Sequence, residues 1–356
     1  IDESVPFPNE VEMRNYQVTR ERTTAVLNLD YRVNNDLTFY ARTTWSDFSD
    51  LEIRNRVEIK YEDAEYDDAA SSGNLAVFTA NEMEIDRDVK DRLETQMIFA
   101  SDFGGEWING GTSVDWSLSY VYAEEAEPDR LDVDFSYEFE DGETFGIDVS
   151  DPMRPQLTFA GGTTTDRVFD SSLYENQGYE LTNGLSQDRE YTATLNIRHD
   201  TELGGLPSYI QYGVRARRRD KMYALDFDVF DDTSLLLSDV ARTVAYDQGP
   251  IGPVPNPTSV RDYFFANLGS LDYVSVDSDI DSFGASYRVE EDVVAGYLMG
   301  SVENGPLRVV GGVRVEQTDM AARGYETFLA EEDATVGGVV LTEDTVFVTP
   351  TSASDD

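Results

Sequence analysis

Two short runs of the sequence gather carboxylates at a spacing that suits a metal ion. They are LDFDVFDD (residues 225–232) and DSDIDS (residues 277–282). Closely spaced carboxylates supply the hard oxygen ligands that Ca²⁺ prefers. The second run is no EF-hand, because Ser282 occupies the glycine position and Arg288 the position of the bidentate glutamate. Solvated acidic loops are the alternative interpretation. The candidate calcium ligands are Asp226, Asp228, Asp231, Asp277, Asp279 and Asp281.

A basic run stands out on this acidic chain. Arg215, Arg217 and Arg219 alternate with the apolar Val214 and Ala216, so a strand here would carry the arginines on one face. That face could guide anionic solutes or meet acidic partners, and salt bridges to neighbouring carboxylates are the alternative. Together with polar residues of an earlier strand, the candidate ligand-binding residues are Tyr40, Arg42, Arg215, Arg217 and Arg219.

No catalytic motif accompanies these groups, so we expect no enzyme activity. A phosphate-binding glycine loop, a nucleophile elbow and an H-E-x-x-H zinc motif are all missing from the sequence. The chain has no Cys and one His, His199, so a Cys/His zinc site is excluded. A formal net charge of −44 argues against nucleic acid as a partner. Apart from possible Ca²⁺, no cofactor is expected.

The elements that must position these residues are β-hairpins. In the stretch around residues 24–45, apolar residues such as Leu27 and Leu29 alternate with polar ones, and an Asn-Asn-Asp turn separates two such runs. A period of two predicts strands with one apolar and one polar face. The same pattern recurs along the chain, and helical periodicity is weak, so we predict an all-β fold. The predicted hairpins cover about residues 22–45, 92–123, 189–219 and 290–318.

The acidity is confined to the segments between and after these hairpins. Residues 46–91, 121–188, 222–292 and 319–356 carry net charges of −9, −14, −11 and −8, which leaves the remaining residues almost neutral. Short turns on one side and long polar loops on the other are typical of outer-membrane barrels. We therefore predict one barrel domain with these four segments as extracellular loops. A soluble antiparallel sandwich, serving as a binding protein or glycosidase, is the alternative.

Three stretches carry a family resemblance. They are RNYQVTRERTTAVLNLDYRVNNDLTFYARTTWSDFSDLEIRNR (residues 14–56), SLSYVYAEEAEPDR (117–130) and VVAGYLMGSVENGPLRVVGGVRVEQTDMAARGYE (293–326). They cover about a third of the chain, and they resemble barrel segments of TonB-dependent outer-membrane receptors of proteobacteria. The resemblance implies energy-coupled uptake of a scarce nutrient, an oligosaccharide or an iron chelate, across the outer membrane.

The same resemblance implies partners: outer-membrane lipid and lipopolysaccharide, a plug domain of the receptor itself, and the TonB complex. The sequence departs from the family in showing eight clear strands rather than 22, no plug-like segment before Tyr16, and an end in SASDD instead of a closing strand with a terminal aromatic. An internal piece of a barrel would reconcile these departures. A passive porin or a surface-structural barrel is the other membrane alternative.

Overall fold

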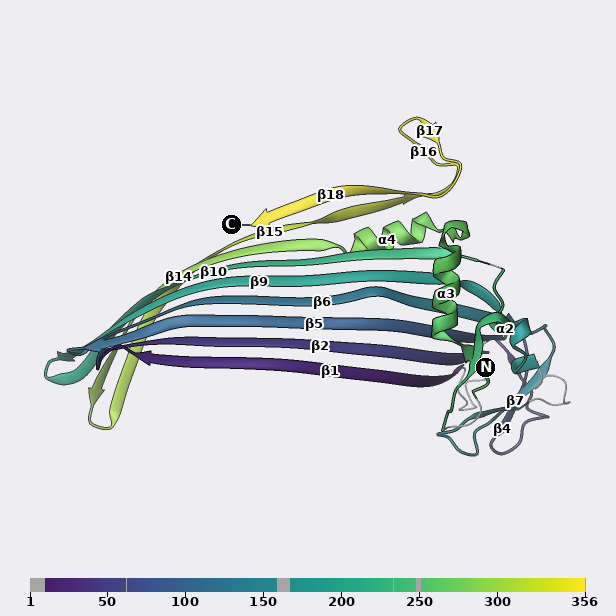
Figure 1. The fold of residues 1–356 in the computed structure, drawn as a ribbon, viewed down its shortest axis with the longest axis horizontal. Coiled ribbons are helices and arrows are strands. Elements are labelled where there is room, and N and C mark those ends of the chain that lie inside the picture. The colour runs from purple at the N-terminus through teal and green to yellow at the C-terminus, as the bar shows by residue number, and fades with distance from the viewer. Residues whose placement is uncertain (1–9, 62, 159–166, 233, 248–250, 356) are drawn as a thin grey trace.

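One large antiparallel sheet dominates the chain, which confirms the all-β prediction. A computed structural model describes residues 10–61, 63–158, 167–232, 234–247 and 251–355. The strand order is β1-β2-β5-β6-β9-β10-β14-β15-β18, and a short strand, β13, also pairs with β10 (Figure 1). The strands are β1 Glu10–Arg32, β2 Leu37–Lys60, β5 Glu84–Asn109, β6 Thr112–Glu138, β9 Glu175–Leu203, β10 Leu206–Asp231, β13 Asp272–Tyr273, β14 Tyr287–Asn304, β15 Leu307–Ala330 and β18 Thr345–Asp355.

Tight turns join the strands at one end of this sheet. Residues 33–36, 110–111, 204–205 and 305–306 link successive strands. Gly110 and Gly111 have φ of 58° and 80°, a region that glycine enters without steric cost and that a two-residue hairpin turn requires. The flanking residues GGEW (104–107) and DTEL (200–203) belong to β5 and β9. The turns at this end are therefore two to four residues long.

At the other end the strands run far into the segments predicted as loops. β2 continues to Lys60, β6 to Glu138 and β10 to Asp231. Period-two alternation runs through these extensions, in LEIRNRVEIKY (51–61) and LDVDFSYEF (131–139). β18, which pairs with Met320–Ala330 of β15, was not predicted. The remaining parts of these segments fold into small sheets and helices.

These small elements form a subdomain at the loop end of the sheet (Figure 1). Its four-stranded sheet comprises β3 Glu65–Tyr66, β4 Leu75–Thr79, β7 Thr144–Asp148 and β8 Gln156–Thr158; around it lie the 3-10 helix η1 Ser171–Leu173, α2 Leu237–Val240, the pair β11 Ala241–Thr243 and β12 Pro253–Pro255, α3 Pro257–Asn267 and the 3-10 helix η2 Leu268–Ser270. Asn256 caps α3 by accepting a hydrogen bond from the backbone N–H of Thr258 (3.1 Å), and Pro257 begins the helix.

The subdomain packs its core against one face of the large sheet. Phe78, Phe145, Tyr174 and Phe264 from the subdomain join sheet residues such as Val57 in one buried cluster. β16 Thr335–Val336 and β17 Val339–Val340 form a separate ribbon. Among the described residues, no helix has the length and apolar character needed to cross a membrane.

Helix α4, Ser275–Ala285, closes a gap in the large sheet. β14 pairs with β10 only as far as Tyr223, so the backbone of β10 beyond that point has no strand on this side until β13. The hydroxyls of Ser278, Ser282 and Ser286, spaced at four residues, accept hydrogen bonds from the N–H groups of Val229 (2.9 Å), Phe227 (2.8 Å) and Leu225 (3.0 Å). Serine hydroxyls thus replace a strand partner and satisfy these N–H groups.

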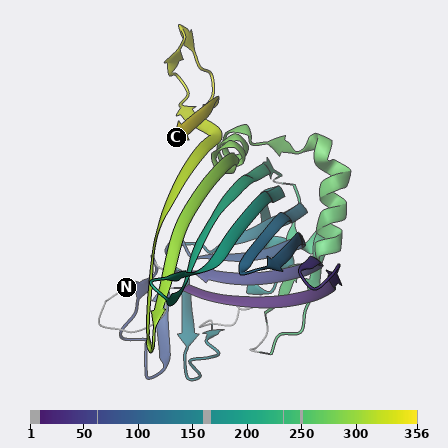
Figure 2. The same cartoon turned by 90° about the vertical axis from the view of Figure 1, so that its left-hand side faces the viewer.

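The large sheet is curved, and Figure 2 shows α3 on its convex side. We call this convex face the outer face and the opposite one the inner face. β1 and β18 lie at opposite edges of the sheet (Figures 1 and 2). The register fixes which residues share a face, because residues directly opposite each other on paired antiparallel strands point to the same side.

Candidate functional site

A continuous apolar band crosses the outer face near the turns. The register places one apolar set from β1 to β15 on this face. Many of its side chains are exposed: Tyr31 at 68%, Val315 at 74% and Leu118 at 55%. An exposed patch of this size is a surface for lipid or another macromolecule. The band comprises Ala25, Leu27, Leu29, Tyr31, Phe39, Ala41, Trp45, Phe99, Phe103, Trp107, Val114, Trp116, Leu118, Tyr120, Tyr122, Tyr191, Ala193, Leu195, Ile197, Ile210, Tyr212, Val214, Ala216, Val294, Leu298, Val302, Val309, Val313 and Val315.

The height of the band matches a bilayer. On β6 it runs from Val114 to Tyr122, eight residue steps or about 26 Å along the strand. Beyond it, the outer face is covered by the subdomain, where Val57 and Ile85 are buried. The same face therefore changes from exposed and apolar near the turns to a covered protein core near the loops.

The band is also slanted relative to the strands. The band is centred near residue 28 on β1 and near residue 312 on β15. Followed through the six intervening strands, however, the register places Asn28 level with Thr318 on β15. The centre thus moves by about six residues, or about 20 Å, over seven strand spacings of about 4.8 Å each. This slope corresponds to strands tilted by about 30° from the normal to the band. Membrane barrels tilt their strands by a similar angle, about 35–45°.

The inner face at the same depth is mostly polar and is hydrogen-bonded across strands, although it also exposes the apolar Val26, Ile98, Ile108 and Val310. Asn196 donates to Asp115 (2.7 Å), Tyr297 donates to Asn196 (2.8 Å), and Gln211 donates to Tyr297 (2.8 Å). Tyr40 lies across Gly104, where a Cβ would overlap its hydroxyl. These contacts give much of the inner face a hydrogen-bonded, hydrophilic surface opposite the apolar band.

All five predicted ligand-binding residues lie on this inner face, but they do not meet. The register aligns Tyr40 with Arg215, and Arg42 with Arg217, with three strands between the members of each pair. At about 4.8 Å per strand, this separates them by about 19 Å along the sheet. They line one surface rather than one pocket.

Most of these arginines are engaged in ion pairs. Arg217 pairs with Glu291, and Arg219 with Asp188, whose Oδ1 lies 3.0 Å from Nε. Arg42 pairs with Asp30 at 2.5 Å. The register partners of Arg215 are the uncharged Thr194 and Ala295, and its side chain is exposed. Within the described residues Arg215 forms no ion pair, so it offers an unneutralised positive charge to the solvent.

The six predicted calcium ligands are distributed over two elements. Asp226, Asp228 and Asp231 lie on β10, and the other three, Asp277, Asp279 and Asp281, lie on α4, so the second run is helical rather than a binding loop. Three of the six, Asp226, Asp228 and Asp279, line one cavity. Over the part of the chain that the structure describes, the one group of three carboxylates close enough to share an ion is instead Glu10, Glu12 and Glu58.

Beyond the band, the inner face carries a dense network of charges that the sequence analysis did not find. Lys90 pairs with Glu52 (2.6 Å), Arg56 with Glu58 (2.8 Å), and Arg54 with Asp88 (3.0 Å). The carboxylates are largely buried, with Asp88 only 5% exposed. Extending the alternating pattern of β2 past residue 46 would have indicated this network, because all of its charged residues on β2 then fall on the inner face.

Asp134 of β6 belongs to this network, and its surroundings disfavour the ionised form of its side chain. Burial, followed by the nearby charges of Asp86 and Asp88, raises the pKa of Asp134 to about 7. Its Oδ1 has no hydrogen-bond partner within the described residues. A cavity of about 380 Å³, lined by Arg54, Asp132 and Asp134 among others, lies beside it. Burial also raises the pKa of Asp132.

We expect Asp134→Asn to stabilise the protein above pH 7. A raised folded-state pKa means that the native protein holds this proton more tightly than the unfolded chain, so the wild type loses stability as the pH rises from about 4 to 7. The amide mimics the protonated acid and removes that loss, by about 2–4 kcal/mol at pH 8. Urea unfolding at pH 4 and pH 8 measures it: equal gains at both pH values would contradict the assignment.

Comparison with protein families, with curated proteins and with solved structures gave no match to this chain. The geometry of the two sheet faces therefore carries the functional argument.

Proposed function

We propose that the chain forms part of the wall of a transport β-barrel in the outer membrane, with the outer face against lipid and the inner face lining a solute path. The observation that carries the proposal is the slanted apolar band. A soluble sandwich would cover such a face with a second sheet, whereas here its side chains are exposed.

The distribution of charge supports the same orientation. Short turns lie at one end of the band, and the acidic, folded connections lie at the other. In bacterial outer-membrane barrels the turns face the periplasm and the long loops face outward. The inner face supplies hydrogen-bonding groups such as Tyr40 and Asn196 along the path, and Arg215 adds a cation that forms no ion pair within the described residues.

The resemblance to TonB-dependent receptors extends the proposal to energy-coupled uptake of a scarce nutrient, an oligosaccharide or an iron chelate. In that case a plug domain would fill the space beside the inner face, and the TonB complex would move it. A passive porin would use the same wall. Dissipating the proton gradient of the inner membrane separates the two, since only energy-coupled uptake stops.

Partitioning tests the membrane assignment directly. The chain, refolded from denaturant, is expected to enter detergent micelles or lipid vesicles and to aggregate in buffer alone, because the band is exposed in the part of the chain that the structure describes. A chain that stays soluble and monomeric in buffer and does not insert into vesicles would overturn the proposal.

A further inference from the structure

We propose that the cavity between β10, α4, β15 and β18 binds a small organic cation, an ammonium group carried on an apolar frame. This site is separate from the inner-face residues discussed above, and it does not depend on the membrane assignment. It lies at the loop end of the sheet, where α4 replaces the missing strand next to β10 (Figure 1).

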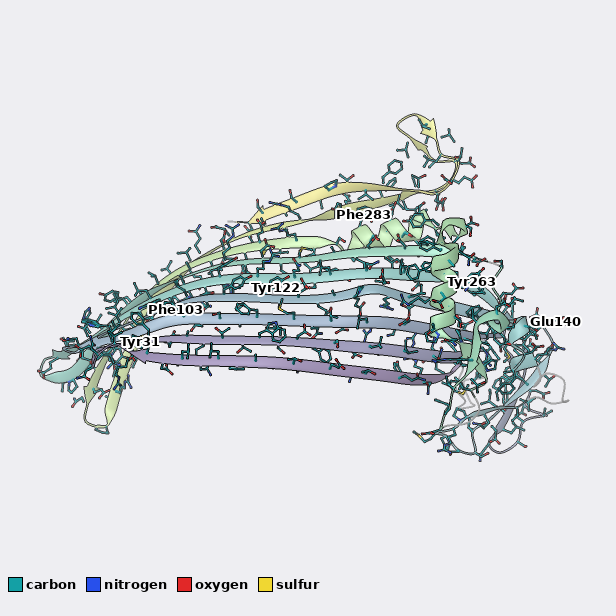
Figure 3. All side chains as sticks on the ribbon, in the orientation of Figure 1. Tyr31, Phe103, Tyr122, Glu140, Tyr263 and Phe283 are labelled. Atoms are coloured by element: carbon teal, nitrogen blue, oxygen red, sulfur yellow. The ribbon has the colours of Figure 1, made fainter. Side chains whose placement is uncertain are left out.

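The cavity has the size and lining of a small-molecule site. Its volume is about 730 Å³, within the range of ligand pockets. Aromatic rings from several elements line it, among them Tyr223, Phe283, Tyr287 and Tyr325. The rings of Tyr223 and Tyr287 lie 6.3 Å apart between centroids, and those of Phe283 and Tyr325 lie 5.0 Å apart. Figure 3 shows Phe283 between α4 and β15.

The charges at this cavity favour a cation. Three carboxylates, Asp226, Asp228 and Asp279, line it, and across the described ranges none of them forms an ion pair with Lys or Arg. The two arginines of the lining are engaged with other carboxylates: Arg288 pairs with Asp220, and Arg323 lies 3.9 Å from Glu290. A cationic ligand would therefore meet unneutralised negative charge.

The acids that line the cavity also repel one another. Burial, then the charge of Asp226 and, more weakly, that of Asp279 raise the pKa of Asp228. A bound ammonium group would relieve this repulsion. Aromatic faces attract cations through their quadrupole, and they give an organic cation an advantage over a bare metal ion, whose water shell they cannot replace. Aromatic rings together with unpaired carboxylates thus define the ligand class.

The experiment uses the full folded chain, in buffer or in detergent micelles according to which keeps it folded, so it depends neither on an uptake assay nor on the membrane assignment. The probe is benzyltrimethylammonium, measured by titration calorimetry at pH 8, with benzyl alcohol as the neutral counterpart and CaCl₂ as the metal alternative. We expect the cation to bind at least ten-fold more tightly than the alcohol. Asp228→Asn and Tyr287→Leu are each expected to weaken it by about ten-fold.

Asp281→Asn is the matched control. Asp281 lies on the same helix, α4, as Asp279, but it does not line the cavity. Unchanged affinity for the cation in this variant supports a local site. If Asp281→Asn weakened binding as much as Asp228→Asn, the binding would come from the overall charge of the chain, and the proposal would be overturned. Binding of the cation no tighter than that of the alcohol would overturn the proposal. If equimolar Ca²⁺ displaced the bound organic cation, and Tyr287→Leu bound that cation as tightly as the wild type, the site would be a metal site and the proposal would be overturned.

Discussion

Leu118→Arg is expected to prevent or strongly weaken folding into lipid vesicles. Leu118 lies at the middle of the apolar band on β6 and is 55% exposed on the outer face. A lipid-facing arginine near the midplane costs about 2–4 kcal/mol in membrane β-barrels. The folded fraction, followed by electrophoretic mobility without heating and by tryptophan fluorescence, should fall in vesicles.

Ser119→Arg provides the matched control one residue further along the same strand. Ser119 points to the inner face and donates a hydrogen bond to Asp102 (2.5 Å), so an arginine there would meet water and a carboxylate. We expect Ser119→Arg to fold nearly as well as the wild type. If both arginines were equally harmful, or if Leu118→Arg were harmless, the outer face would not be in contact with lipid.

Arg87→Ala is expected to detach the loop subdomain from the sheet. Arg87 of β5 is 1% exposed, and its guanidinium donates to the carbonyls of Ile251 (2.8 Å), Pro253 (2.8 Å) and Val168 (2.9 Å). It also lies over the ring of Tyr174, 4.8 Å from the centroid. One side chain thus joins three segments that are far apart in sequence, and its loss should cost about 3–4 kcal/mol of local stability.

Hydrogen exchange and limited proteolysis measure that loss. In Arg87→Ala, the backbone of 167–174 and 251–257 should exchange faster, while the strands near the turns keep their protection. Arg87→Lys should recover little, because an ammonium group lacks the planar fork of the guanidinium. Arg54→Ala, on the inner face of the same region, serves as a control, since Arg54 pairs with Asp88 and not with the subdomain. Unchanged protection in Arg87→Ala would contradict its role as a clamp.

The hairpins and the two sheet faces were predictable from the sequence because both follow from local alternation. Leu27, Leu118 and Val313 fall on the outer face because alternate residues of a strand point to the same side and the apolar residues occupy one set of alternate positions. The extent of the strands was harder to predict. Past the band the alternation continues, because Val57 packs under the subdomain while its neighbour Glu58 joins the ion network on the opposite face. The strands therefore run on into acidic segments whose charge had favoured loops.

The helices and the cavity depend on contacts that the sequence leaves hidden. Asn256 followed by Pro257 is a recognisable start signal for α3, but it lies in a proline-rich stretch that favours a loop interpretation. The serines of α4 serve β10, which is more than 40 residues earlier, and this pairing has no local signature. Asp228 and Asp279 line the same cavity only because α4 lies along β10, so the fold brings together two acidic runs that are about 50 residues apart in the sequence.

Quenching of tryptophan fluorescence by brominated lipids tests the central claim most directly. The chain has three tryptophans, Trp45, Trp107 and Trp116, and all of them lie on the outer face within the apolar band. In vesicles, bromine deep in the acyl chains should quench Trp116, bromine near the headgroups should quench Trp45 and Trp107 at the borders of the band, and aqueous iodide should have little effect. Strong iodide quenching without lipid quenching would contradict a membrane-facing sheet.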